Sequence, residues 1–556
     1  MRRPVTAAVL PFAVLLSALI ASAQASADIV ITNANIRTMD AKRTTARSIA
    51  SLNGRIVAIG SESDTKPFIG SRTRVIDAGG RTVIPGFNDA HVHFMETGQQ
   101  LSSVDLRDAR TPAEFVARIK AFAAKTPKGR WILGGKWDHE NWTPNNLPTA
   151  AMIDAVTPDH PVFIDRLDGH MALANSLAMK LAGVDRNIKD VPGGEIVRDA
   201  SGNPSGVFKD AAMNYFGKAI PAPSWEERLE IAQAATDHAA SLGVTSVQDM
   251  SADGTEAGVY QELLRRGTLK TRVYSCSPLH DYKRWEATGL RFAYGDPMLR
   301  VGCLKAYADG SLGSTTAWFF EPYLDAPDSR GLAMEDVTTT MRQTMVRADK
   351  AGLQIRVHAI GDRANASIFD HFAAVEKTNG ASGRRFTIEH AQHLRQDDIK
   401  RFGSQKVVAS MQPFHAIDDG RWAWKRLDEK RIKGTYAFRS ILDTGGVLAF
   451  GSDSPVAPLN PLWGVYAAVT RRTLDDKNPT GWVPEQKISV DETVRSFTWG
   501  SAFAEFQDNI KGTLEIGKVT DLVILSDDIF TIDPVKIWDV KPMFTVVDGK
   551  VVFERK

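Results

Sequence analysis

The 556-residue chain is 43% hydrophobic and 24% charged, and its formal net charge is +2. These proportions are ordinary for a globular protein, and the length suits one large barrel with additions or more than one domain. The small net charge, without a block of like charges or a basic stripe, excludes an electrostatic case for nucleic acid or an anionic membrane as a partner.

The first 27 residues have the pattern of an export signal. Arg2 and Arg3 precede an uncharged, mostly apolar segment from Val5 to about Ala21, and small residues with A-x-A spacing continue to Ala27. The apolar segment is short for a membrane span, so we favour a cleaved signal peptide over an uncleaved anchor. Subtracting its two arginine charges from +2 leaves a neutral mature chain, which we expect in the periplasm or outside the cell.

Both ends of the remaining chain are rich in short β-like runs. Asn53-Gly54 and Asp548-Gly549 are hairpin-turn dipeptides between such runs. We therefore predict one small β-sandwich domain that residues 28–84 and 512–556 build together.

Residues 85–511 alternate short apolar strands with amphipathic helical stretches, which is the pattern of parallel βα units. After the strand that contains His91 and His93, seven further candidate strands follow, at 244–248, 272–276, 300–305, 354–358, 386–390, 407–411 and 447–451. Eight strands predict an α/β protein with a (β/α)₈ TIM-type barrel. The interval from about 95 to 243 is too long for one βα step, so we expect a large insertion with its own structure after the first barrel strand.

The chain has two cysteines, Cys276 and Cys303, which excludes a scaffold built from disulfides. Both lie in predicted neighbouring strands, so a single bridge is one interpretation. We favour two buried free thiols.

Polar side chains lie at or just beyond the ends of five predicted barrel strands. His91 and His93 point to the same face of the first strand, because side chains alternate along a strand. Lys305, His358, His390 and Asp453 follow in chain order. In a barrel these strand ends meet at one mouth, where active sites lie. A single histidine at a strand end is usually structural, but this set favours a site for Zn²⁺ or a similar divalent metal, with one or two ions per chain.

Several sequence motifs together resemble the amidohydrolase superfamily, and within it the subgroup of N-substituted formamide deformylase. The resemblance covers nearly the whole chain after the leader. Its motifs are Pro85-Gly86-Phe87-Asn88-Asp89-Ala90-His91-Val92-His93, Gly135-Lys136-Trp137-Asp138, Asp168-Gly169-His170, Lys305-Ala306-Tyr307-Ala308-Asp309-Gly310-Ser311, His358-Ala359-Ile360-Gly361-Asp362, Ile388-Glu389-His390-Ala391-Gln392 and Gly451-Ser452-Asp453-Ser454-Pro455.

The resemblance implies a role for each candidate ligand. His91 and His93 would bind the more buried metal, and His358 and His390 a second one. Lys305, once N6-carboxylated, would bridge the two, and Asp453 would ligate the first metal and act as the general base. The alternative for Lys305 is an ordinary ion pair with Asp309 or Glu389, which leaves a one-metal site.

Further residues extend the predicted site. We expect His415, after the seventh strand, to stabilise an oxyanion; the alternative is a surface residue. Asp138 and His170 lie in the insertion, which would fold over the barrel mouth as a lid and bring His170 to the catalytic site; the alternative for both residues is a polar network within the insertion. Asp138, Trp137, Trp318 and Phe414 are predicted to contact the substrate, although the three aromatic side chains would serve equally to pack the loops.

Taken together, these features predict an exported metal-dependent hydrolase of an amide-type C–N bond in a small, apolar or aromatic substrate. One alternative is an esterase, lactonase or cyclic-amide hydrolase with the same site, and another is a non-catalytic exported metal-binding protein. We expect a small molecule as partner, no nucleic acid, and no membrane contact beyond export. The sequence leaves a monomer and a homo-oligomer both open.

Overall fold

The computed structural model describes residues 25–139, 142–166, 171–191, 194–252, 254–313 and 315–556. Most of the predicted export segment, 1–27, lies outside these ranges, so its role stays a prediction. Within the described ranges, no helix has both the length and the apolar character needed to cross a membrane.

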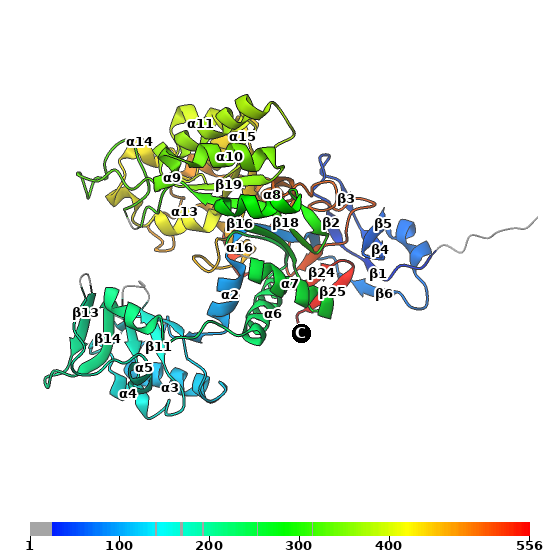
Figure 1. Ribbon diagram of the computed structural model, residues 1–556. Coiled ribbons are helices and arrows are strands. Elements are labelled where there is room, and N and C mark those ends of the chain that lie inside the picture. The colour runs from blue at the N-terminus through cyan, green and yellow to red at the C-terminus, as the bar shows by residue number, and fades with distance from the viewer. Residues whose placement is uncertain (1–24, 140–141, 167–170, 192–193, 253, 314) are drawn as a thin grey trace, which may run out of the picture.

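Eight parallel strands form the central sheet (Figure 1). They are β8 (Phe87–Val92), β15 (Val244–Asp249), β16 (Arg272–Pro278), β18 (Leu299–Tyr307), β19 (Gln354–Ala359), β20 (Thr387–His390), β21 (Val408–Met411) and β22 (Val447–Phe450). Each pairs in parallel with the next, and β17 (Tyr294–Asp296) adds an antiparallel edge to β18. This confirms the predicted TIM-type barrel and its eight strands.

Helices cover the outside of the barrel. They include α6 (Trp225–Ser241), α7 (Gly254–Arg266), α10 (Met341–Lys350), α11 (Asp362–Asn379), α12 (Gln396–Ser404) and α16 (Pro461–Thr470). The sequence sets the start of α6: Ser224 and Glu227 form a reciprocal capping box that satisfies backbone N–H groups of the first turn. The buried faces of these helices join one apolar core with the strands, which holds the strand ends in place.

The barrel closes where the segment after β22 meets the end of β8. Backbone N–H groups of Asp453 and His93 donate to the carbonyl oxygens of His91 (2.7 Å) and Ser454 (2.8 Å). The Ser452 N–H donates to the buried Asp89 carboxylate at 3.0 Å. A Cβ atom at position 451 would lie 2.5 Å from the backbone nitrogen of His91, so the contact between these two segments, the seam of the barrel, requires glycine there. The seam therefore brings Asp453 to the two histidines of β8.

Strands from both ends of the chain form two further sheets. One has the order β5-β4-β1-β6, with β1 (Ile29–Thr32), β4 (Ser48–Leu52), β5 (Arg55–Gly60) and β6 (Arg74–Asp77); the other joins β2 (Asn35–Arg37), β3 (Thr45–Ala46) and β7 (Thr82–Pro85) to β23 (Leu522–Leu525), β24 (Pro542–Val547) and β25 (Lys550–Glu554). One buried apolar cluster contains residues of both sheets, so they pack as a sandwich. The exact domain limits 28–84, 85–511 and 512–556 stay predictions.

The insertion forms a separate body beside the barrel (Figure 1). Its six strands, in the order β13-β14-β12-β11-β10-β9, are β13 (Gly194–Arg198), β14 (Pro204–Asp210), β12 (Met171–Ala174), β11 (Phe163–Arg166), β10 (Gly134–Trp137) and β9 (Val104–Asp105). They pack with α3 (Pro112–Ala123) around their own apolar clusters. Helix α2 (Phe94–Leu101) begins directly after His93 and packs against α6. It therefore connects the strand of the two predicted metal-binding histidines to the insertion.

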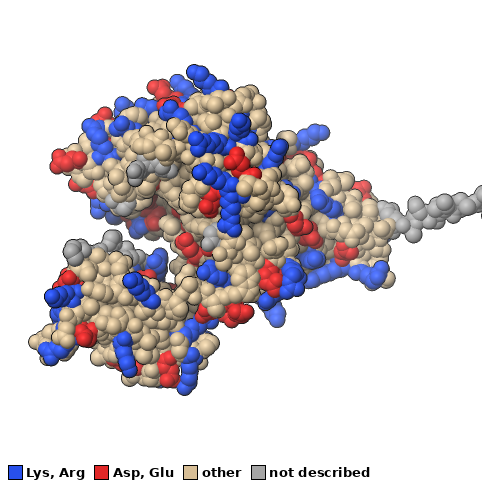
Figure 2. Space-filling view, viewed as in Figure 1, with Lys and Arg blue, Asp and Glu red and all other residues tan. Residues whose placement is uncertain are grey.

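Figure 2 shows lysine and arginine interspersed with aspartate and glutamate over the visible face, and a hollow between the insertion and the barrel. This mixed surface agrees with the small net charge of the chain.

The preference for two free thiols is wrong. Cys276 of β16 and Cys303 of β18 form a disulfide, with their Cα atoms 4.4 Å apart. The two cysteines are direct register partners of adjacent parallel strands, so their side chains meet on one face. Register, which the sequence did not reveal, decides between the two interpretations.

Candidate metal centre

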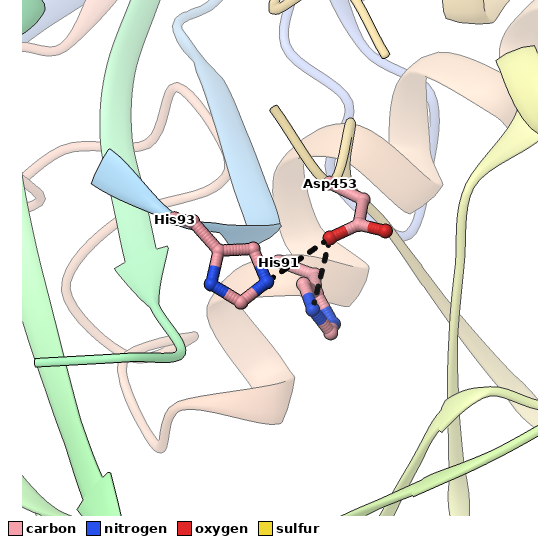
Figure 3. Close-up of side chains that lie close together, drawn as sticks. All are labelled: His91, His93 and Asp453. Atoms are coloured by element: carbon pink, nitrogen blue, oxygen red, sulfur yellow. Dashed lines mark ion pairs between the residues drawn. The ribbon is translucent and has the colours of Figure 1, made fainter. Parts of the chain in front are cut away.

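His91, His93 and Asp453 point toward one another at the end of β8 (Figure 3). The Asp453 Oδ1 atom lies 3.4 Å from the Nε2 atom of His91 and 3.3 Å from that of His93. Two ligand atoms that are each about 2.0–2.1 Å from one tetrahedral Zn²⁺ lie about 3.3–3.4 Å apart. The spacing and the donor types therefore fit a single divalent cation.

A buried carboxylate orients His91. The Nδ1 atom of His91 lies 2.6 Å from Glu389 Oε2, and the Arg356 guanidinium donates to the other Glu389 oxygen at 2.5 Å. All three side chains are fully buried. Burial would raise the pKa of Glu389, but Arg356 and His91 hold it well below its usual range. An ionised Glu389 accepts a hydrogen bond from the Nδ1–H group of His91, so the lone pair on Nε2 faces the site.

His390 and His358 complete the ring of imidazoles. His390 Nδ1 lies 2.9 Å from Gln412 Oε1, and His358 Nε2 lies 3.1 Å from the Gly310 carbonyl oxygen. The ring centroid of His390 lies 4.4 Å from the ring centroid of His358 and 4.8 Å from the ring centroid of His91. Burial lowers the pKa of His358 to about 3 and that of His91 to about 4. These imidazoles are thus neutral at pH 7, which is the form that binds a metal.

Asp453 is the candidate anionic ligand. Burial would raise its pKa, but the surrounding imidazoles, His91 first, hold the pKa well below its usual range. Its backbone φ of +62° and that of His390, +70°, are in the left-handed region, which side chains other than glycine adopt at a cost of roughly 1 kcal/mol or more. Such strain is typical of functional sites.

Lys305 reaches the same centre. Its Nζ atom is buried and lies 3.3 Å from His91 Nε2. The carboxylate of Asp309 accepts hydrogen bonds from the backbone N–H groups of Ile360 and Gly361, at 3.0 and 2.8 Å. Among the residues that the structure describes, Lys305 forms no ion pair within 4.0 Å of Asp309 or Glu389, although the charge of Glu389 still acts on it. The one-metal and two-metal interpretations both stay predictions.

The structure brings His415 to the site and leaves His170 untested. His415 lies in α13 (Pro413–Asp419), with its Nε2 atom 3.9 Å from Asp453 Oδ2 and its ring stacked on that of His390 at 6.4 Å. His170 is outside the described residues. The predicted catalytic roles of both histidines stay predictions.

The predicted substrate contacts divide between barrel and insertion. Trp318 follows β18, donates its backbone N–H to Asp309 and lies under the Arg363 guanidinium. Phe414 stacks near Trp463 and Trp538, which sequence reasoning missed.

In the insertion, Trp137 is not brought to the barrel mouth. It is fully buried in the insertion's own core and donates its indole N–H to the Ile164 carbonyl oxygen at 2.9 Å. Asp138 forms an ion pair with Arg166 at 2.7 Å, as the alternative of a polar network within the insertion predicts.

The positioning residues Glu389, Arg356 and Gln412 were not predicted as such. A usable signal was present, because charged side chains inside otherwise apolar barrel strands must be buried and paired. Arg356 and Glu389 occupy such positions in β19 and β20.

Replacing Glu389 tests the orientation of His91. We expect Glu389→Gln to weaken metal binding about 10–100-fold, because the amide no longer fixes the Nδ1–H tautomer. Competition with a chromophoric chelator measures the affinity. Glu505→Gln, which removes a buried carboxylate paired with Lys511, is the matched control. Equal affinities in the two variants would contradict the role of Glu389.

Known proteins resemble the chain over most of its length. Residues 74–553 match the model of the amidohydrolase family. The Arabidopsis thaliana protein LONG AFTER FAR-RED 3 is 39% identical over 517 residues, 90% of this chain and 87% of that protein. N-substituted formamide deformylase from Arthrobacter pascens is 26% identical over 545 residues, 95% of this chain and 98% of that enzyme.

A solved structure supports the same relationship. The crystal structure of an uncharacterized metal-dependent hydrolase from Pyrococcus furiosus matches with a TM-score of 0.76 and 29% identity, over 90% of this chain and all of that one. The resemblance inferred from the sequence motifs is confirmed: the chain belongs to the amidohydrolase family and is a metal-dependent hydrolase.

Proposed function

We propose that this hydrolase cleaves the amide-type C–N bond of a small, apolar or aromatic substrate, with Asp453 as general base. The observation that carries the proposal is the Asp453 carboxylate, whose Oδ1 atom lies between two imidazole nitrogens at 3.3 and 3.4 Å. The relative named N-substituted formamide deformylase supports an amide substrate. The stacked rings of Phe414, Trp463 and Trp538 support an aromatic one, because Phe414 directly precedes His415 in the chain.

The chain's own groups supply the proton transfers. A divalent cation held by His91, His93 and Asp453, with Zn²⁺ as the first candidate, would lower the pKa of water from about 16 to about 7 and polarise the substrate carbonyl. Asp453 takes one proton from the attacking water while the water oxygen bonds to the acyl carbon. The C–N bond then breaks, and Asp453 returns the proton to the leaving nitrogen, which departs as the neutral amine.

Lys305 is proposed to be N6-carboxylated. Burial lowers its pKa to about 8, so even near pH 7 part of the population is the neutral amine, whose nitrogen attacks the carbon of CO₂ and loses a proton to give the carbamate. The carbamate provides acceptor oxygens for metals that an ammonium group lacks. Native mass spectrometry checks this: we expect the mass of one CO₂, lost from the chain on acidification. A mass that acid leaves unchanged would contradict carboxylation.

Export is proposed as well. The leader pattern of residues 1–27 supports it, and so does the Cys276–Cys303 disulfide, because such bonds persist in oxidising compartments.

A substrate panel with one variant tests the function. The protein is stripped with a chelator, reloaded with Zn²⁺ and offered N-formyl and N-acyl arylamines, matching aryl esters and lactones. We expect metal-dependent release of the arylamine. Asp453→Asn should lower kcat by about 10²–10⁴-fold, because the amide cannot take the proton, while His91 and His93 retain much of the metal.

The control is Asp398→Asn, which removes a buried carboxylate paired with Arg395 on the barrel exterior. A fully active Asp453→Asn enzyme would rule out the general-base role. Turnover of esters or lactones without amides would favour the alternative substrates, and no turnover by metal-loaded protein would favour a metal-binding protein without catalysis.

A further inference from the structure

The Nδ1 atom of His93 has no hydrogen-bond partner among the residues that the structure describes. The Nε2 atom of this imidazole faces Asp453 at 3.3 Å, and Nδ1 lies on the other side of the ring (Figure 3). Nδ1 is buried and unpaired. Buried polar atoms are nearly always paired, and a histidine that binds a metal through one nitrogen donates the N–H of the other to an acceptor. His91 has such an acceptor in Glu389, whereas His93 does not.

The carboxylate of Glu96 lies beside this nitrogen. Its Oε1 atom is 4.0 Å from His93 Nδ1, and the Glu96 side chain is 59% exposed. A hydrogen bond between an N–H group and a carboxylate is about 2.7–2.9 Å long, so the carboxylate has to move by only about 1 Å to accept from Nδ1. An exposed glutamate side chain, which is not held by packing, makes such a movement at little cost.

The start of α2 places Glu96 over the imidazole. His93 is the N-cap residue of α2, and Glu96 is the third residue of the helix. From that position a glutamate reaches back to the N-cap residue and accepts its backbone N–H in a capping box. The His93 N–H, however, already donates to the carbonyl oxygen of Ser454 at 2.8 Å. The reach of the Glu96 carboxylate is therefore available to the His93 side chain.

The backbone around this pair of residues is fixed. The Thr97 hydroxyl donates to the His93 carbonyl oxygen at 2.9 Å. A Cβ atom at Gly98 would lie 2.1 Å from the Ile231 carbonyl oxygen, so α2 packs closely against α6 at this point. Because the helix is held at its first turns, only the Glu96 side chain has to turn toward His93.

We propose that Glu96 is a positioning residue, whose carboxylate accepts a hydrogen bond from the Nδ1–H group of His93 while Nε2 binds the cation. The inference rests on the proposed function for that cation, which His91, His93 and Asp453 hold. The hydrogen bond fixes the tautomer and the ring plane of His93, and so raises the affinity for the metal. Glu96 does for His93, from the exposed side, what the buried Glu389 does for His91.

Two other effects of a carboxylate at this place have to be separated from positioning. An acidic residue in the first turn stabilises a helix through the helix dipole, and any negative charge near a cation attracts it. Neither effect depends on the imidazole of His93, whereas the proposed role does.

A double-mutant cycle on metal affinity makes this separation. Wild type, Glu96→Gln, His93→Ala and the double variant are each titrated with Zn²⁺ against a chromophoric chelator. We expect Glu96→Gln to weaken binding about tenfold in the wild-type background and to leave the affinity of His93→Ala unchanged, because no Nδ1–H group remains there to accept from. The matched control is Glu226→Gln, which removes an exposed acid from the first turn of α6 and should bind like wild type.

The Co²⁺ absorption spectrum at saturation gives a second readout. It should differ between wild type and Glu96→Gln, because the ring of His93 is held differently, and it decides the question should His93→Ala bind too weakly for a titration. A distant charge changes the affinity but leaves the spectrum of the saturated site as it is.

Three results would overturn the inference: equal affinities of wild type and Glu96→Gln, an equal loss in the His93→Ala background, or identical saturated spectra. Amide hydrolysis by wild type in any of these cases leaves the proposed function standing, whereas wild type that binds no metal removes both. Circular dichroism verifies folding, and Glu96→Ala is read in the same way should Glu96→Gln fail to fold.

Discussion

The closure of the barrel between β22 and β8 is the constraint on which the site depends. Asp453 and His91 are 362 positions apart in the chain, yet the Asp453 N–H donates to the His91 carbonyl oxygen at 2.7 Å. The buried Asp89 carboxylate accepts the Ser452 N–H beside it. Because this seam fixes the backbone of both residues, their side chains meet without any further ordering when a cation arrives.

Buried charge in the barrel interior serves the same centre. Arg356 neutralises Glu389, and Glu389 faces His91, so a fully buried ion pair fixes the ring nitrogen that a metal would use. Replacing such a pair with apolar residues often costs little stability. The ion pair lies next to the candidate ligand His91, so its role is better explained by the positioning of that imidazole than by a contribution to the stability of the fold.

Strand alternation and the barrel rule were sufficient to predict the eight strands, the pair His91 and His93, and the convergence of Lys305, His358, His390 and Asp453 at one mouth. The rest could not be read from the sequence, for physical reasons. The pairing of Cys276 with Cys303 depends on the register between two strands. Trp137 packs in the insertion's own apolar core, which depends on the tertiary structure of the insertion, and its predicted contact with the substrate stays a prediction. The buried Nε2 nitrogen of His415, which has no hydrogen-bond partner among the described residues, is visible only once its neighbours have been placed.

The central claim is that His91, His93 and Asp453 hold one divalent cation. Anomalous diffraction at the zinc edge from Zn²⁺-loaded crystals tests it most directly. We expect a peak about 2.0–2.2 Å from both Nε2 atoms and from Oδ1 of Asp453. A zinc-loaded crystal whose strongest peak lies outside this triad would contradict the account.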